Sequence, residues 1–219
     1  MAVMFVYSGH AQVEQVDWTQ FYTGTVDQSQ TAGTATSYPL YRNFYGWNRA
    51  VSAWQMFQPG VSGDLGGIAV DLLNATAGGS VDLNIYAGAG VQGTLLESTH
   101  LEWTSGFNKY PGVWYTLLLS TPVTVTAGDT YTFSFENLSS DTALRYVVDP
   151  TSNPYSDGEY FQQGYFFGGQ NYYTSPSTTA DMNFETIMDP ISPAPEPSFP
   201  AIFAMSMLGG GLLLLWPKK

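Results

Sequence analysis

The 219-residue sequence contains no cysteine, which excludes disulfides, zinc–thiolate sites, iron–sulfur clusters and cysteine nucleophiles. Positive charge is also scarce: 6 Lys and Arg stand against 18 Asp and Glu, giving a net charge of −12. A nucleic-acid partner requires a basic surface that neutralises phosphates, and this composition does not supply one. We therefore expect no nucleic-acid binding, and the acidity favours solubility or offers oxygen ligands to divalent cations.

Amphipathic helical periodicity is absent from the body of the chain, where apolar residues instead alternate with a period of two. Turns rich in glycine or containing proline separate the alternating runs. About eight strands with this spacing predict an all-β fold, an antiparallel β-sandwich of the jelly-roll type. The alternating runs are residues 68–72, 81–86, 115–119, 123–125, 131–135, 144–148 and 182–184.

The N-terminal residues resemble the second half of a secretory signal peptide. A short apolar run, residues 2–7, precedes Gly9-His10-Ala11, a small-x-small cleavage site that would make Gln12 the new first residue. No basic residue precedes the run, so we interpret it as the remnant of a signal peptide whose start lies upstream. The alternative is a short buried strand at the edge of the domain.

The C-terminus combines a proline-rich spacer, an apolar span and a basic end. Alternating prolines in residues 189–198 forbid a helix and favour an extended chain. Residues 199–216 are 18 uncharged positions, enough for a helix that crosses a bilayer core at about 1.5 Å per residue. The final Lys218 and Lys219 would stay on the cytoplasmic side, which places the upstream domain outside the membrane.

This tail resembles the PEP-CTERM sorting signal of Gram-negative bacteria that make extracellular polysaccharide. The resemblance implies processing by an exosortase, a membrane-embedded cysteine transpeptidase. It also implies a protein anchored in the inner membrane before processing, and then located at the cell surface or outside the cell. The matching residues are Pro195, Glu196, Pro197, the span 199–216 with Gly209, Gly210 and Gly211, and the pair Lys218 and Lys219.

The body resembles a bacterial extracellular module of the choice-of-anchor type, which accompanies assorted surface anchors. The resemblance covers roughly residues 52–187 and implies a jelly-roll fold. The expected segments are a signal remnant (1–11), a lead-in or edge segment (12–51), the sandwich (52–188), the linker (189–198), the membrane helix (199–216) and the basic stop (217–219). The matching stretches are residues 55–65, 81–96, 121–131, 153–155 and 181–186.

These observations predict a non-enzymatic, exported cell-surface or matrix protein associated with extracellular polysaccharide. A lectin-like carbohydrate-binding module is the alternative, because aromatic faces stack on sugar rings while amides and carboxylates bond hydroxyls. Residues 153–173 and the loop 104–112 are rich in such side chains, although these aromatics could equally fill the core, as we expect of Phe161, Phe166 and Phe167. The candidate ligand-binding residues are Trp103, Tyr110, Trp114, Tyr155, Tyr160, Tyr172 and Tyr173.

A structural calcium ion is a secondary alternative, with Asp149, Asp157 and Glu159 as its ligands in a turn-rich stretch. No other cofactor is expected.

Catalytic patterns are weak, and we predict no catalytic residue. The stretch 88–93 matches a dinucleotide-binding pattern but is followed by an expected strand, so we interpret it as a hairpin turn. No G-x-S-x-G elbow occurs, and His100 is expected to be a hydrogen-bonded surface residue. A glycoside hydrolase or lyase is the third alternative. Its carboxylates would come from Glu97, Glu102, Glu136, Glu159 and Glu185.

Overall fold

The computed structural model describes residues 12–17, 22–31, 36–41, 52–139, 143–149, 155–166, 170–173 and 180–193. Within these ranges the regular elements are fourteen β-strands in two sheets, sheet A and sheet B. Sheet A contains β1 (Gln12–Gln15), β4 (Ser52–Phe57), β6 (Gly79–Ala87), β7 (Thr94–Trp103), β9 (Tyr131–Glu136), β11 (Tyr160–Phe166) and β12 (Gln170–Tyr173). Sheet B contains β2 (Tyr22–Gln30), β3 (Thr36–Tyr41), β5 (Gly63–Ala75), β8 (Phe107–Val125), β10 (Ala143–Asp149), β13 (Asp181–Met182) and β14 (Phe184–Pro193).

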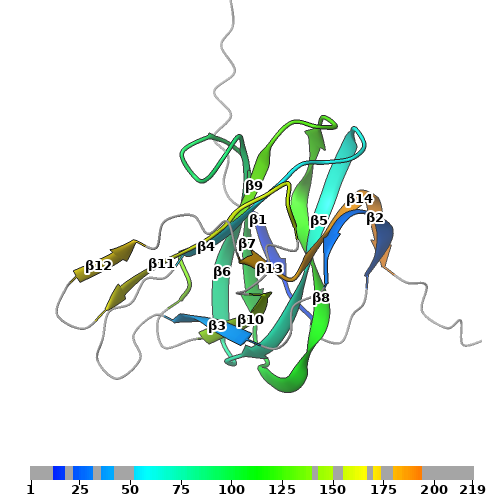
Figure 1. The fold of residues 1–219 in the computed structure, drawn as a ribbon. Helices are drawn as coiled ribbons and strands as arrows, with labels where there is room; N and C mark the ends of the chain where they lie inside the picture. The colour runs from blue at the N-terminus through cyan, green and yellow to red at the C-terminus, as the bar shows by residue number, and fades with distance from the viewer. Residues whose placement is uncertain are drawn as a thin grey trace, which may run out of the picture.

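The two sheets pack face to face, so the structure is the all-β sandwich that the alternation predicts (Figure 1). Sheet A has the order β1-β7-β6-β9-β4-β11-β12. In sheet B the long strand β5 pairs with β8, and also with β14 and β10 along successive segments. Among the described strands every pairing is antiparallel except that of β1 with β7, which is parallel.

The core lies between the sheets and is centred on aromatic rings. Phe133 of β9 has no exposed surface, and its ring centroid lies 5.4 Å from that of Phe184, 6.0 Å from Phe135 and 6.4 Å from Phe57. Because Phe184 comes from sheet B and the other three from sheet A, this cluster joins the layers. The other fully buried large side chains are Leu65, Ile68, Leu72, Leu83, Ile85 and Leu101.

The structure contains more strands than the eight or so predicted, partly because residues 12–51 contribute β1, β2 and β3 rather than a lead-in alone. β2 lies at the edge of sheet B, where it pairs with β14. Three of its consecutive residues, 24–26, are all exposed, and burial does not alternate along the described part of the strand, which ends at the buried Gln30. A strand of this kind is held by backbone hydrogen bonds and leaves no period-two signal in the sequence.

The described chain ends with β14, which continues past residue 188 into the expected linker. Its last residues, Ser192 and Pro193, pair with Thr23 and Tyr22 of β2. The Pro-Glu-Pro triplet, the apolar span 199–216, the lysine pair and residues 1–11 lie outside the described residues. Among the residues that the structure does describe, no helix has the length and apolarity that crossing a membrane requires.

Candidate functional site

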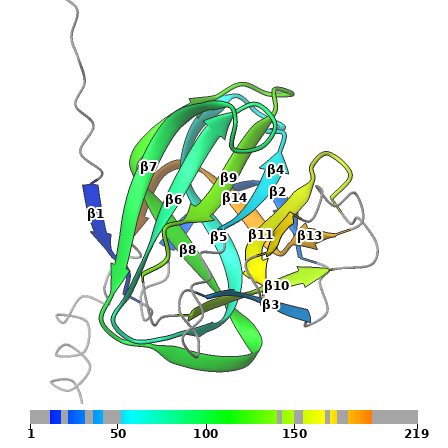
Figure 2. The same cartoon turned by 90° about the vertical axis from the view of Figure 1, so that its left-hand side faces the viewer.

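Figure 2 shows the five neighbouring strands β7, β6, β9, β4 and β11 of sheet A side by side. The outer face of these strands, which points away from the core, gathers polar and aromatic side chains. The core-facing residues of β6 are Val81, Leu83 and Ile85, so the residues between them face outward. The pairing register extends this outer face across the neighbouring strands. The residues that form the candidate site on this face are His100 and Glu102 (β7), Asp82, Asn84 and Tyr86 (β6), Ser134 and Glu136 (β9), Trp54 (β4) and Phe161 (β11).

At one end of this face, His100 lies between two carboxylates. Its Nδ1 is 2.5 Å from Oδ1 of Asp82, and its Nε2 is 3.4 Å from Oε1 of Glu102. The amide of Asn137 donates to the second oxygen of Asp82 at 2.7 Å, and Gln15 donates to the second oxygen of Glu102 at 3.0 Å. The expectation that His100 is a hydrogen-bonded surface residue is confirmed.

In the middle of the face, one carboxylate oxygen accepts two hydroxyl groups. Oε1 of Glu136 accepts from Tyr86 at 2.9 Å and from Ser134 at 2.6 Å. Burial, together with the hydrogen bond to Glu136 and the negative charge of that residue, raises the pKa of Tyr86 to about 12. The phenol is therefore a neutral donor at physiological pH.

Asn84 lies beside this cluster and is only 5% exposed. Its Oδ1 atom is buried without a hydrogen-bond partner among the described residues. An unsatisfied buried acceptor costs about 1–3 kcal/mol. The outer face therefore contains a carbonyl oxygen that lacks a donor.

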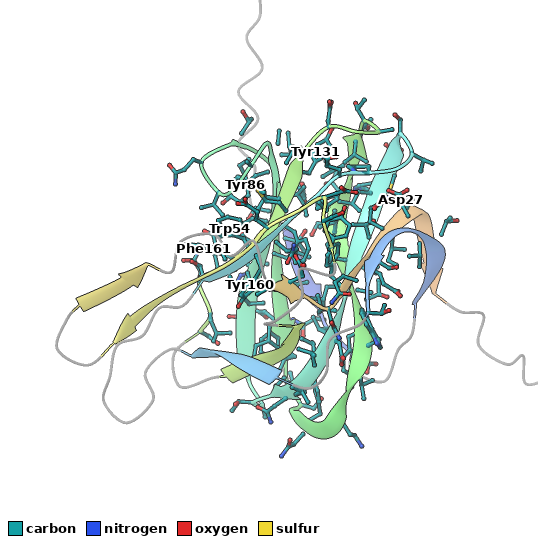
Figure 3. All side chains as sticks on the ribbon, viewed as in Figure 1. Asp27, Trp54, Tyr86, Tyr131, Tyr160 and Phe161 are labelled. Atoms are coloured by element: carbon teal, nitrogen blue, oxygen red, sulfur yellow. The ribbon has the colours of Figure 1, made fainter. Side chains whose placement is uncertain are left out.

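An aromatic pair borders the polar groups. Trp54 and Phe161 face each other across β4 and β11 with ring centroids 4.9 Å apart and an interplanar angle of 17°. Trp54 is nearly buried and Phe161 is half-buried, which differs from the core position expected of Phe161. Figure 3 shows both rings on the same side of the molecule as Tyr86.

The glycine-rich loop between β6 and β7 packs against the outer face of sheet A beside Trp54. It is a hairpin connection between two strands, as predicted, rather than a dinucleotide-binding turn. The N–H of Gly90 donates to Oγ1 of Thr132 at 2.8 Å, and a Cβ at Gly90 would lie 3.7 Å from the Trp54 ring. The loop is thus held against the outer face.

Two carboxylates oppose each other directly on this face. Asp82 of β6 and Glu136 of β9 are register partners, and side chains in such positions have Cβ atoms about 4.5–5.5 Å apart. Like charges placed this way destabilise a sheet. No described strand of sheet A carries Lys or Arg. Asp82 is bonded to His100 and Asn137, and Glu136 accepts only from the neutral hydroxyls of Tyr86 and Ser134.

The structure places three of the predicted sugar-binding aromatics in the core. Trp103 is 2% exposed, and its indole N–H donates to the carbonyl of Thr76 at 2.6 Å. Tyr155 and Tyr160 are 6% and 5% exposed. Buried rings cannot offer a face to a sugar, so these three side chains support the alternative that the aromatics fill the sandwich.

The other predicted aromatics are spread over both sheets. Trp114 is half-buried in β8 of sheet B, paired with Asp71 rather than with the outer face of sheet A. The backbones of Tyr110, Tyr172 and Tyr173 belong to β8 and β12, and their side chains lie outside the described part of the chain.

The predicted calcium ligands are not seen as one group. Asp157 is exposed and Glu159 is half-buried before β11, while Asp149 ends β10, with its side chain outside the described part. Where side chains are described, no three His, Asp or Glu residues form a group suited to a metal ion. The calcium site stays a prediction.

Four residues of this face are named from the sequence in other roles: His100 as a surface residue, Glu102 and Glu136 as possible hydrolase carboxylates, and Phe161 as a core residue. Asp82, Asn84 and Tyr86 were recognised only as the polar half of an alternating strand, and Trp54 was not singled out. Their grouping depends on the order β7-β6-β9-β4-β11, which brings together segments far apart in the sequence. The available signal is the run of polar outward positions on three strands, which contains no Lys or Arg.

No protein family matches the sequence. No curated protein matches it either. Two structures of infectious bursal disease virus show a weak similarity: 12% identity and a TM-score of 0.19 for the Gx strain, and 14% and 0.16 for the Gt strain. The alignments cover 87% and 86% of this chain and 47% of each viral chain, so the chain spans about half the length of those proteins. At these TM-scores the similarity carries no argument about function.

Proposed function

We propose that this chain is a non-enzymatic, exported surface protein that binds polysaccharide through the outer face of sheet A. The observation that carries the proposal is the pairing of Asp82 with Glu136, beside the unsatisfied Oδ1 of Asn84. Both features cost stability, and neither is needed to close a sandwich. Binding sites keep such features because a ligand supplies the missing partners.

The aromatic pair supports a sugar ligand. A pyranose ring presents apolar C–H groups to an aromatic side chain and hydroxyls to carboxylates and amides. The half-buried ring of Phe161 and the acceptors of Asp82, Asn84 and Glu136 lie on one face within four adjacent strands. Sugar binding by Tyr110, Tyr172 and Tyr173 stays a prediction.

Replacing Phe161 with alanine is expected to weaken polysaccharide binding by about three- to tenfold, because one stacking surface is lost. The measurement is affinity electrophoresis of the full chain, kept in detergent, through gels that contain neutral, acidic or amino-sugar polysaccharides. Phe107→Ala is the matched control: Phe107 is also half-buried and also lies 4.9 Å from an aromatic ring, Tyr115, but belongs to sheet B. Equal weakening by both substitutions, or no retardation in any gel, would contradict the proposal.

The location forms part of the same proposal. We infer that the body is a jelly-roll module of the choice-of-anchor type, delivered by a PEP-CTERM tail whose apolar span forms a membrane helix. Pro195, Glu196 and Pro197 then form the exosortase recognition motif, and the processed protein stays at the cell surface or enters the extracellular matrix.

Deleting the exosortase of the native host is expected to leave the span 199–216 on the protein, which stays in the inner membrane. In the parent strain, mass spectrometry of the mature protein should find a C-terminus near Pro197. Replacing the triplet by Ala-Ala-Ala should reproduce the deletion, whereas Pro217→Ala should not. An intact protein in the cytoplasm of the parent strain would rule out this part of the proposal.

A further inference from the structure

The outer face of sheet A offers acceptors almost exclusively. Three carboxylates lie on this face, and its described strands carry neither Lys nor Arg. A carboxylate accepts hydrogen bonds and donates none. The Tyr86 and Ser134 hydroxyls already donate to Glu136, so they are not free donors for a ligand. The three carboxylates are Asp82, Glu102 and Glu136, whereas Glu97 accepts from the N–H of Thr121 in sheet B.

The unsatisfied atom on this face is also an acceptor. Oδ1 of Asn84 lies on β6 between Asp82 and Tyr86, and directly opposite Ser134. Ser134 donates to Oε1 of Glu136, so the register places Asn84 beside this carboxylate cluster. A ligand that satisfied this atom would have to donate a hydrogen bond to it. The unsatisfied Oδ1 of Asn84 is thus a second observation, independent of the carboxylates, that favours a ligand with donor groups.

Charge selects further among glycans. A glycan with uronate or sulfate groups would bring negative charge against Asp82, Glu102 and Glu136. The described strands of sheet A carry no Lys or Arg to offset that charge, and His100 already lies between Asp82 and Glu102. A protonated amino sugar brings the opposite charge and three N–H donors with no competing lone pair. It can also lie near the Trp54–Phe161 pair, where a cation is attracted to the aromatic rings.

We propose that the glycan bound at the outer face of sheet A is a positively charged amino-sugar polymer, a polysaccharide of free hexosamine units. This inference rests on the proposed sugar-binding function and specifies its ligand class. The glycan ammonium groups lie among Asp82, Asn84 and Glu136, and the sugar rings continue over Phe161.

Three hexamers with one backbone test the inference by calorimetry on the full chain: β-1,4-linked glucosamine, its N-acetylated form and its N-succinylated form. We expect the free amine to bind about tenfold more tightly than the N-acetyl form at low salt, and the N-succinyl form not to bind. The preference should shrink as salt is added, because exposed ion pairs are screened.

Substitutions distinguish binding at this site from a general attraction of cations to the overall charge of −12. Glu136→Gln keeps an oxygen that accepts from Tyr86 and Ser134, so the fold is retained while the preference for the amine falls about threefold or more. Asp82→Asn is the second variant and should act in the same direction. Asp64→Asn removes one exposed carboxylate from sheet B and should leave the preference unchanged.

The possible results are distinct. Equal binding of the amine and N-acetyl forms, or preference for the N-succinyl form, would overturn the inference and leave sugar binding intact. Hexalysine binding as tightly as the glucosamine hexamer, with Asp64→Asn as harmful as Glu136→Gln, would overturn it in favour of a non-specific charge effect. Failure of all three hexamers and of every polysaccharide gel would overturn the proposed function as well.

Discussion

Replacing Phe133 with alanine is expected to lower the free energy of unfolding by about 3–5 kcal/mol. The ring is fully buried and contacts aromatic rings of both sheets, Phe57 and Phe135 from sheet A and Phe184 from sheet B. Its removal leaves a cavity in the middle of the sandwich, because strands fixed by ladder hydrogen bonds cannot move inward to fill it. This is the largest loss that we expect from a single substitution.

Urea unfolding followed by tryptophan fluorescence measures this loss. Phe133→Leu, which keeps most of the apolar volume, should cost clearly less than the alanine variant. Phe107→Ala is the control for a half-buried ring and should also cost less. If Phe133→Ala and Phe107→Ala were equally destabilising, Phe133 would not be the centre of the core.

Replacing Asp181 with alanine is expected to cost about 3 kcal/mol, since each buried donor left without an acceptor costs about 1–3 kcal/mol. Asp181 is completely buried at the start of β13. Its Oδ1 accepts from Nε2 of Gln55 at 2.9 Å, and its Oδ2 accepts from the N–H of Tyr155 at 3.0 Å. Oε1 of Gln55 in turn accepts from the N–H of Met182 at 2.9 Å.

This network joins the layers by polar contacts, because Gln55 belongs to sheet A and Asp181 to sheet B. The variant Asp181→Ala should therefore lose stability and also loosen the segment that leads into β11, which hydrogen exchange at the Tyr155 amide would detect. Asp157→Ala removes an exposed carboxylate two residues after Tyr155 and should change neither quantity. Unchanged exchange at Tyr155 in the Asp181 variant would contradict this role.

Strands with one apolar face were predictable because apolar and polar side chains alternate along them. Residues 81–86 form part of β6, 131–135 lie in β9, and 115–119 and 123–125 both fall in β8. β2 was not predictable, because it is an edge strand with consecutive exposed residues. Its place depends on β14, more than 150 positions away, and local periodicity carries no such information.

The candidate site was less predictable than the fold. Trp103, Tyr155 and Tyr160 were chosen for their chemistry, but alternation and loop closure turn their side chains into the core. Tyr86 and Glu136 are 50 positions apart and meet only because β6 pairs with β9. The composition shows that carboxylates outnumber Lys and Arg in this chain. The strand order determines which of these carboxylates lie together.

β14 also determines how the sandwich bears load. It leads directly into the C-terminal tail, and its hydrogen bonds run to β5 on one side and to β2 on the other. Tension applied to the tail along the axis of β14 loads both rows of bonds in shear, so several must break together before the strand slides. If the domain is anchored by its C-terminus, as proposed, it would thus resist unfolding by a pull on its tail. Sheet A would meanwhile remain folded and available to the proposed polysaccharide.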